Sequence, residues 1–196
     1  MSTHAVPSAA SANRAIGAMF FAVFGTAWLA WGDVIARGHV DVLVVPVAVA
    51  GAGLLAFAWR RFQAHRSARA AVEGTPRARR TNRVFHIVNT AQWVAILVLA
   101  NVLDNLGLGI WKVPMVIAVV GLHFLPLAAS MGYKPHYLSG AALVGLAATY
   151  PFVAAAGPLS AAGPIGAGLV LWASAILALA AGAGRGPGAA SPTMPA

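Results

Sequence analysis

The chain has 196 residues, of which 60% are hydrophobic and only 9% are charged, and its formal net charge is +9. A soluble domain carries about 25% charged residues, so this composition excludes an ordinary soluble globular protein. The sequence contains no cysteine, which excludes disulfides, iron–sulfur clusters and thiolate metal sites.

Six apolar segments follow one another, each close to the roughly 20 residues that cross a bilayer core. They cover residues 16–35, 42–59, 84–103, 113–130, 137–156 and 164–183. Arg14 precedes the first segment as in a signal peptide, but the length and aromatic content of that segment favour a retained helix. We therefore expect an all-α, six-helix transmembrane domain over residues 15–183. A flexible head, residues 1–14, precedes it and a disordered tail, residues 184–196, follows it.

The segment of residues 60–83 joins the second and third apolar segments and is strongly basic. By the positive-inside rule this loop is cytoplasmic, which places both termini in the cytoplasm, and we expect the inner membrane of a bacterium. The arginines expected to contact anionic lipid headgroups are Arg60, Arg61, Arg66, Arg69, Arg79 and Arg80. Because membrane orientation accounts for the basic charge, we expect no nucleic-acid partner.

Two patterns bear on how the helices pack. Residues 45–54 and 113–122 share the pattern V-P-x-x-x-A-x-x-G-L, so the first two helices and the next two form a possible parallel repeat, with chance similarity as the alternative. Small residues allow close backbone approach between helices, and here they are Gly51, Gly53, Gly163, Gly166 and Gly168. Such faces also suit a homodimer or association with other membrane subunits.

The apolar segment of residues 84–103 is the most polar of the six. A stripe of side chains at steps of three or four residues shares one helix face, namely His86, Thr90, Trp93, Leu97, Asn101 and Asp104, with Asn89 and Gln92 beside it. Polar groups are costly in hydrocarbon, so we expect this stripe to face the interior of the bundle or a water-filled cavity. It has two interpretations: a solute or proton path, or hydrogen bonds that only hold helices together.

His123 is the deepest ionisable residue and lies one turn before Pro126, which we expect to kink the helix and free the carbonyl of Leu122. It is either a working titratable group or a neutral side chain bonded to that carbonyl or to an amide of the preceding helix. His86 and His123 are a conceivable haem or metal pair, but no further ligand set accompanies them, so we expect no cofactor.

Acidic residues gather at the opposite ends of the helices. Asp33, Asp41 and Asp104 form either an outer vestibule for cations or ordinary solvated helix ends.

No nucleotide-binding, metalloprotease or hydrolase motif is present. We expect a small transporter or permease-like protein for a small solute or ion. Its path would run between the third and fourth helices and be lined by His86, Asn89, Gln92, Asn101, Asp104 and His123. The alternatives are a non-catalytic structural or accessory membrane subunit and, with no motif in its favour, a membrane enzyme or haem protein.

Overall fold

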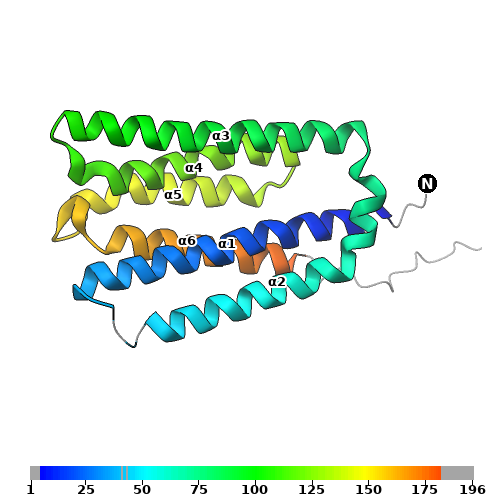
Figure 1. Ribbon diagram of the computed structural model, residues 1–196, viewed down its shortest axis with the longest axis horizontal. Helices are drawn as coiled ribbons and strands as arrows, with labels where there is room; N and C mark the ends of the chain where they lie inside the picture. The colour runs from blue at the N-terminus through cyan, green and yellow to red at the C-terminus, as the bar shows by residue number, and fades with distance from the viewer. Residues whose placement is uncertain (1–4, 41, 43, 182–196) are drawn as a thin grey trace, which may run out of the picture.

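The computed structural model describes residues 5–40, 42 and 44–181, and these are helical apart from the connections between helices (Figure 1). The long helices are α1 (Ala5–Arg37), α2 (Val44–Glu73), α3 (Pro76–Asn105), α4 (Lys112–Met131), α5 (Pro135–Val153) and α6 (Ala162–Ala180). Two 3-10 turns, η1 (Gly109–Trp111) and η2 (Gly157–Leu159), precede α4 and α6. The expected all-α architecture is confirmed.

Five of the described helices, α1, α2, α3, α4 and α6, are long and apolar enough to cross a membrane. The sixth, α5, has 19 residues, and both of its ends carry proline and tyrosine. These residues make α5 less apolar than a typical membrane span. It nevertheless lies beside α4 and α6 in the bundle (Figure 1). Five spans are supported, and the sixth stays a prediction.

Helices continue into two of the expected extramembrane segments, whose membrane limits stay predictions. α1 begins at Ala5, so most of the head that we expected to be flexible is helical. Most of the basic loop is helical too, because α2 continues to Glu73 and α3 begins at Pro76. Alanine and arginine are strong helix formers and extend these helices beyond their apolar parts. The expected tail, residues 184–196, lies outside the described residues.

The turn between α2 and α3 is short and well capped. Gly74 and Thr75 separate the two helices, and Pro76 occupies the first turn of α3. The Thr75 hydroxyl donates to the Val72 carbonyl at 2.8 Å and accepts from the Ala78 amide at 3.3 Å, which satisfies a free donor at the helix start. We call the end of the bundle that carries this turn and the start of α1 the basic end.

In space the helices follow the order α2, α1, α6, α5, α4, α3, each packed on its neighbours (Figure 1). Although α2 and α3 are consecutive in the sequence, they diverge from their turn to opposite edges of the bundle (Figure 1). No side chain of described α3 is fully buried, which agrees with its edge position.

Glycines set the closest contacts between the inner helices. A methyl group on Gly25 of α1 would lie 3.1 Å from the carbonyl oxygen of Gly168 of α6, and one on Gly168 would lie 2.8 Å from the Gly25 carbonyl oxygen. The α4–α5 pair repeats this arrangement, because a methyl on Gly121 would lie 2.9 Å from the Gly140 oxygen. Backbones therefore touch where a larger side chain would hold them apart.

The small-residue expectation is confirmed for four of its five glycines. Gly51 packs on Thr26, Gly163 on the Tyr150 ring, Gly166 on Leu146 and Gly168 on α1. The expectation was wrong for Gly53, because a methyl group at this position would meet only open space.

The possible repeat is not confirmed. Its aligned glycines have different surroundings, because Gly53 is open while Gly121 is pressed against α5. The aligned prolines differ as well, with Pro46 exposed on α2 and Pro114 buried on α4.

The α4–α5 contact predicts a clear contrast between two alanine substitutions. Gly121→Ala would place a methyl group against backbone atoms of α5 that cannot move aside, so we expect a loss of about 1–3 kcal/mol in the free energy of unfolding. Gly145→Ala on α5 enters open space and should be neutral or slightly stabilising. Thermal unfolding of both variants in the same detergent measures the difference, and equal unfolding temperatures would contradict this packing.

Candidate functional site

The polar stripe of α3 points away from the rest of the chain. All six of its members are exposed: His86, Thr90, Trp93, Leu97, Asn101 and Asp104. α4 packs instead on the opposite face of α3, where Phe85 and Val88 contact the core. The expectation that this stripe faces the interior of the bundle was therefore wrong for a single chain, because α3 packs on α4 through its apolar face.

The side of α3 that faces α4 carries two amide side chains, and the hollow beyond them is lined by apolar residues. Asn89 and Gln92 lie partly buried on that side, and Gln92 Oε1 is buried without a hydrogen-bond partner among the described residues. Further along, α3, α4 and α5 enclose an open hollow of about 400 Å³ lined by apolar side chains such as Leu103, Met115, Val144 and Phe152. Such a lining offers no stabilisation to a hydrated ion. The expected polar path is not found along this part of the described structure.

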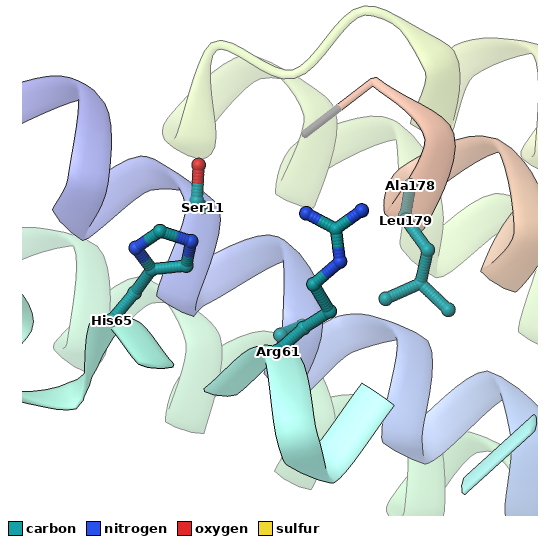
Figure 2. Close-up of a pocket in the computed structure, with 6 residues that line it drawn as sticks. Ser11, Arg61, His65, Ala178 and Leu179 are labelled. Carbon is teal, nitrogen blue, oxygen red and sulfur yellow. The ribbon is translucent and has the colours of Figure 1, made fainter. Parts of the chain in front are cut away.

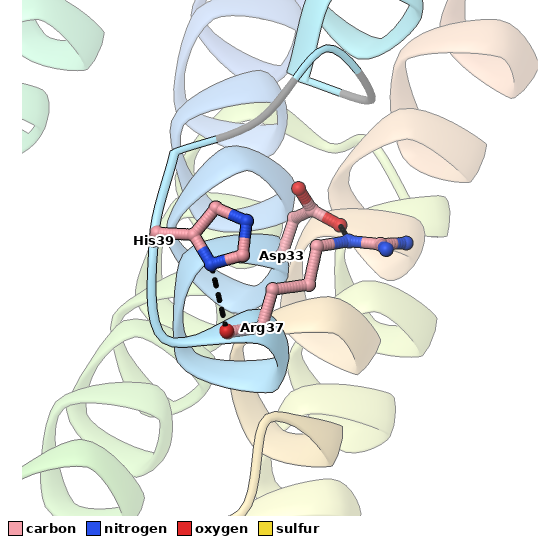
Figure 3. Close-up of polar contacts among 3 residues, drawn as sticks. All are labelled: Asp33, Arg37 and His39. Carbon is pink, nitrogen blue, oxygen red and sulfur yellow. Dashed lines mark hydrogen bonds and ion pairs between the residues drawn. The ribbon is translucent and has the colours of Figure 1, made fainter.

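The acidic candidates are separated rather than gathered. Asp33 Oδ1 accepts from Arg37 Nε at 2.7 Å, and the His39 ring lies 3.1 Å from the Arg37 carbonyl oxygen (Figure 3). Asp104 pairs with Lys112 at 2.6 Å, at the far edge of the bundle on α3. Asp41 lies outside the described residues. Asp33 and Asp104 therefore do not form one vestibule, because the helices that carry them do not pack on each other.

His123 lies partly buried on α4, with its ring Nδ1 2.6 Å from the Val120 carbonyl oxygen. The alternative in which His123 bonds to the Leu122 carbonyl is not observed, because the ring contacts the Val120 carbonyl instead. α4 continues as a helix through Pro126 to Met131. His86 is exposed on α3 while His123 packs toward α5, so the structure does not bring the two imidazoles together as a haem pair. Among the described residues, no group of three or more potential side-chain ligands is placed to hold a metal ion.

A group of polar and aromatic side chains meets at the basic end, between α1, α4 and α5. The rings of Tyr133 and His136 lie 4.8 Å apart, and those of His123 and Phe124 lie 4.3 Å apart. His136 in turn contacts Phe124 and Phe21, at 5.8 and 5.7 Å between ring centroids. We call Arg14, Tyr133, His136 and His123 the basic-end cluster, and the two buried phenylalanines form its apolar floor.

Two atoms of the basic-end cluster are buried without a hydrogen-bond partner in the described structure: Arg14 Nε and Tyr133 Oη. Arg14 uses one of its terminal nitrogens to donate to Ser11 Oγ at 2.9 Å. Burial raises the pKa of the Tyr133 phenol above its ordinary value and the positive charge of Arg14 opposes that shift, so Tyr133 remains a hydrogen-bond donor at neutral pH. Within the part of the chain that the structure describes, the cluster thus holds two donor groups without an acceptor.

Among the described residues, no carboxylate forms an ion pair with the cluster. The whole chain has four acidic residues. Asp41 lies outside the described residues, and Asp33 and Asp104 belong to the last turns of α1 and α3, away from the basic end. The remaining one, Glu73, is exposed at the end of α2, 3.6 Å from Arg69. A partly buried guanidinium without an acidic neighbour is costly unless an anion pairs with it.

On the other side of α1, a cavity of about 10 Å³ lies between α1, α2 and α6. Ser11, Arg61 and His65 line it together with apolar residues of α6 (Figure 2). The Arg61 guanidinium reaches from α2 toward α6, and His65 lies beside Ser11 (Figure 2). This volume fits one water molecule, so the cavity is too small for a solute. Ser11 thus accepts a hydrogen bond from Arg14 and also lines this cavity with the basic side chains Arg61 and His65.

The arginines expected to contact lipid lie on the helical extensions at the basic end. Arg60, Arg66, Arg79 and Arg80 are exposed, whereas Arg61 and Arg69 are partly buried. Arg61 stacks on Phe57 with 5.4 Å to the ring centroid. These arginines lie on the helical continuations of α2 and α3, which fix their spacing, and not on a flexible loop.

Of the basic-end cluster, only His123 was a candidate from the sequence. Arg14 was read as a flank of the first span, and neither Tyr133 nor His136 was singled out from the sequence. A usable signal was present, because Tyr133 and His136 are three residues apart where one helix ends and the next begins. Their meeting with Arg14 depends on the helix order, which no local pattern gives.

No protein-family model matches the chain, and no curated protein or solved structure is significantly similar to it.

Two tyrosine substitutions test the state of the Tyr133 hydroxyl. Tyr133→Phe removes a hydroxyl that has no hydrogen-bond partner among the described residues, so the free energy of unfolding should be unchanged or rise by about 1 kcal/mol. Tyr150→Phe is the matched control, because Tyr150 Oη donates to the Pro158 carbonyl at 3.1 Å and its loss should cost about 1 kcal/mol. Thermal unfolding measures both, and an equal loss in the two variants would show that Tyr133 is hydrogen-bonded.

Proposed function

We propose that this protein is a small permease-like membrane protein that binds a small anionic solute at its basic end. The solute would contact Arg14 and Tyr133 as donors, with His136 and His123 completing the site. This moves the site from the α3–α4 boundary to the junction of α1, α4 and α5, and it keeps His123 as a member.

One observation supports the proposal: among the described residues, the buried Arg14 Nε and the nearby Tyr133 hydroxyl have no hydrogen-bond partner, and no carboxylate there pairs with Arg14. An anion with two or more oxygens would accept from both groups at once, and charge-assisted bonds of this kind are the strong ones. The imidazoles add groups that can donate or accept according to their tautomer. Phosphate, sulfate and carboxylate groups share this chemistry.

We propose further that the basic end faces the cytoplasm of a bacterium, with both termini on that side of the inner membrane. The support is the excess of arginine at the ends of α2 and α3, since Lys and Arg bias determines orientation. Arg60, Arg66, Arg79 and Arg80 would then contact anionic headgroups of the cytoplasmic leaflet. An anionic solute would thus bind from the cytoplasmic side.

A non-catalytic accessory subunit is the second candidate. The tight interior favours it, because Ser139 and Ser174 are buried and hydrogen-bonded at 2.7 Å between α5 and α6. Trp172 likewise donates to Thr26 at 3.2 Å between α6 and α1. Polar groups used in this way hold helices together rather than line a path.

Anion-dependent stability separates these candidates. The full chain in lipid nanodiscs should gain about 1.4 kcal/mol when its anion is present at ten times its Kd. The probes are inorganic phosphate, sulfate and acetate, each compared with chloride at equal ionic strength because surface charges are screened by salt. We expect at least one probe to raise the unfolding temperature, and Arg14→Gln to remove that rise.

Arg79→Gln is the matched control, because Arg79 is exposed on α3 and should leave the anion effect intact. An anion that stabilises the protein should also enter proteoliposomes containing it, and Arg14→Gln should abolish that uptake. Binding without uptake would favour the accessory subunit. If no probe stabilises the protein, or if Arg14→Gln responds like the original, the anion site is wrong.

A further inference from the structure

The exposed stripe of α3 is a polar surface at membrane depth. From His86 to Asp104 it runs for about 27 Å along the helix, at 1.5 Å per residue, which nearly matches a hydrocarbon core of about 30 Å. α3 is an edge helix (Figure 1). Its stripe residues are exposed, whereas Phe85 and Val88 on another face pack on the core. Hydrocarbon therefore surrounds these groups in a single chain.

Several of these groups need hydrogen bonds that the chain itself does not supply. Asn101 accepts from Asn105 at 3.0 Å, which leaves its own amide hydrogens available within the described structure. Thr90 and His86 are exposed on the same face, about three and four turns closer to the basic end than Asn101. Polar side chains in a membrane are normally covered by protein or by water, because lipid cannot bond to them.

We infer that the α3 stripe is covered by a second copy of this chain, in a dimer with α3 packed on α3. The asymmetric distribution of arginine gives all copies one orientation, so the two-fold axis runs along the membrane normal. Each stripe residue then meets its own counterpart at the same depth.

The stripe is complementary to itself. An amide, a hydroxyl and an imidazole can each donate and accept, so Asn101, Thr90 and His86 can each bond to their own counterparts. The single charge of the stripe, Asp104, is held by Lys112 of its own chain at 2.6 Å, which removes like-charge repulsion there. A partner of different sequence would need matching groups at these depths, whereas a second copy has them by symmetry.

Arginines continue this face beyond the membrane. Arg79 and Arg83 are exposed one or two turns before His86, at the basic end. They lie where water and salt screen repulsion over about 8 Å and where anionic headgroups supply counter-charge. They therefore weaken the dimer only modestly, and the stripe within the membrane determines the contact.

The absence of natural cysteine makes a direct test possible, since each engineered cysteine is the only one in the chain. Leu97→Cys places it on the stripe, at a residue 68% exposed. Val98→Cys places it on the neighbouring face of α3, at a residue 55% exposed, and Leu177→Cys places it on α6. With mild oxidation of the full chain in proteoliposomes, we expect disulfide dimers several-fold more abundant for Leu97→Cys than for either control.

A second measurement addresses the hydrogen bonds. Asn101→Leu should raise the dimer dissociation constant about three- to tenfold, measured by energy transfer between labelled copies in vesicles. Asn89→Leu, which changes the same residue type at a partly buried position outside the stripe, should leave the constant unchanged. Equal cross-linking at residues 97, 98 and 177, or an unchanged constant for Asn101→Leu, would overturn the α3 dimer.

Discussion

Close backbone approach at a few glycines is the constraint on which the rest of the structure depends. Lipid tails are as apolar as leucine, so burial alone does not drive helices together within a membrane. Contact area and short distances must supply that energy, and Gly25 with Gly168 and Gly121 with Gly140 provide both. These contacts join α1 to α6 and α4 to α5. The two pairs meet through α5 and α6, and they form the interior of the bundle.

The same constraint explains where the chemistry lies. Because α1 pairs with α6, its basic start lies beside the turn between α4 and α5, and Arg14 comes close to Tyr133 although the sequence separates them widely. The helices left over, α2 and α3, occupy the edges and expose most of their surface. The basic-end cluster therefore forms because the α1–α6 and α4–α5 pairs bring its residues together. The polar stripe of α3, in contrast, has no neighbouring helix of the described chain and can pack on a partner.

The sequence predicts the existence of the helices but not their faces. Apolar length marks a span because every backbone group in hydrocarbon must be bonded within a helix, so α1 to α4 and α6 were located correctly. Helix faces were harder, since a leucine facing lipid, such as Leu97, looks like one facing protein, such as Leu143. The stripe of α3 was assigned inward from the cost of polar groups, without knowing that a whole helix side lacks a neighbour. His123 was found by its depth, but Arg14 and His136 required the helix order.

The most direct test of this order is the distance between the two edge helices. Spin labels at Val49→Cys on α2 and Leu97→Cys on α3, both highly exposed positions, report it by pulsed electron resonance in nanodiscs, with excess unlabelled chain to suppress signals between copies. Packed helices lie about 8–10 Å apart between their axes. The order α2, α1, α6, α5, α4, α3 predicts a label separation well beyond that of neighbouring helices. A separation typical of adjacent helices would contradict it, since α2 and α3 would then form an ordinary hairpin.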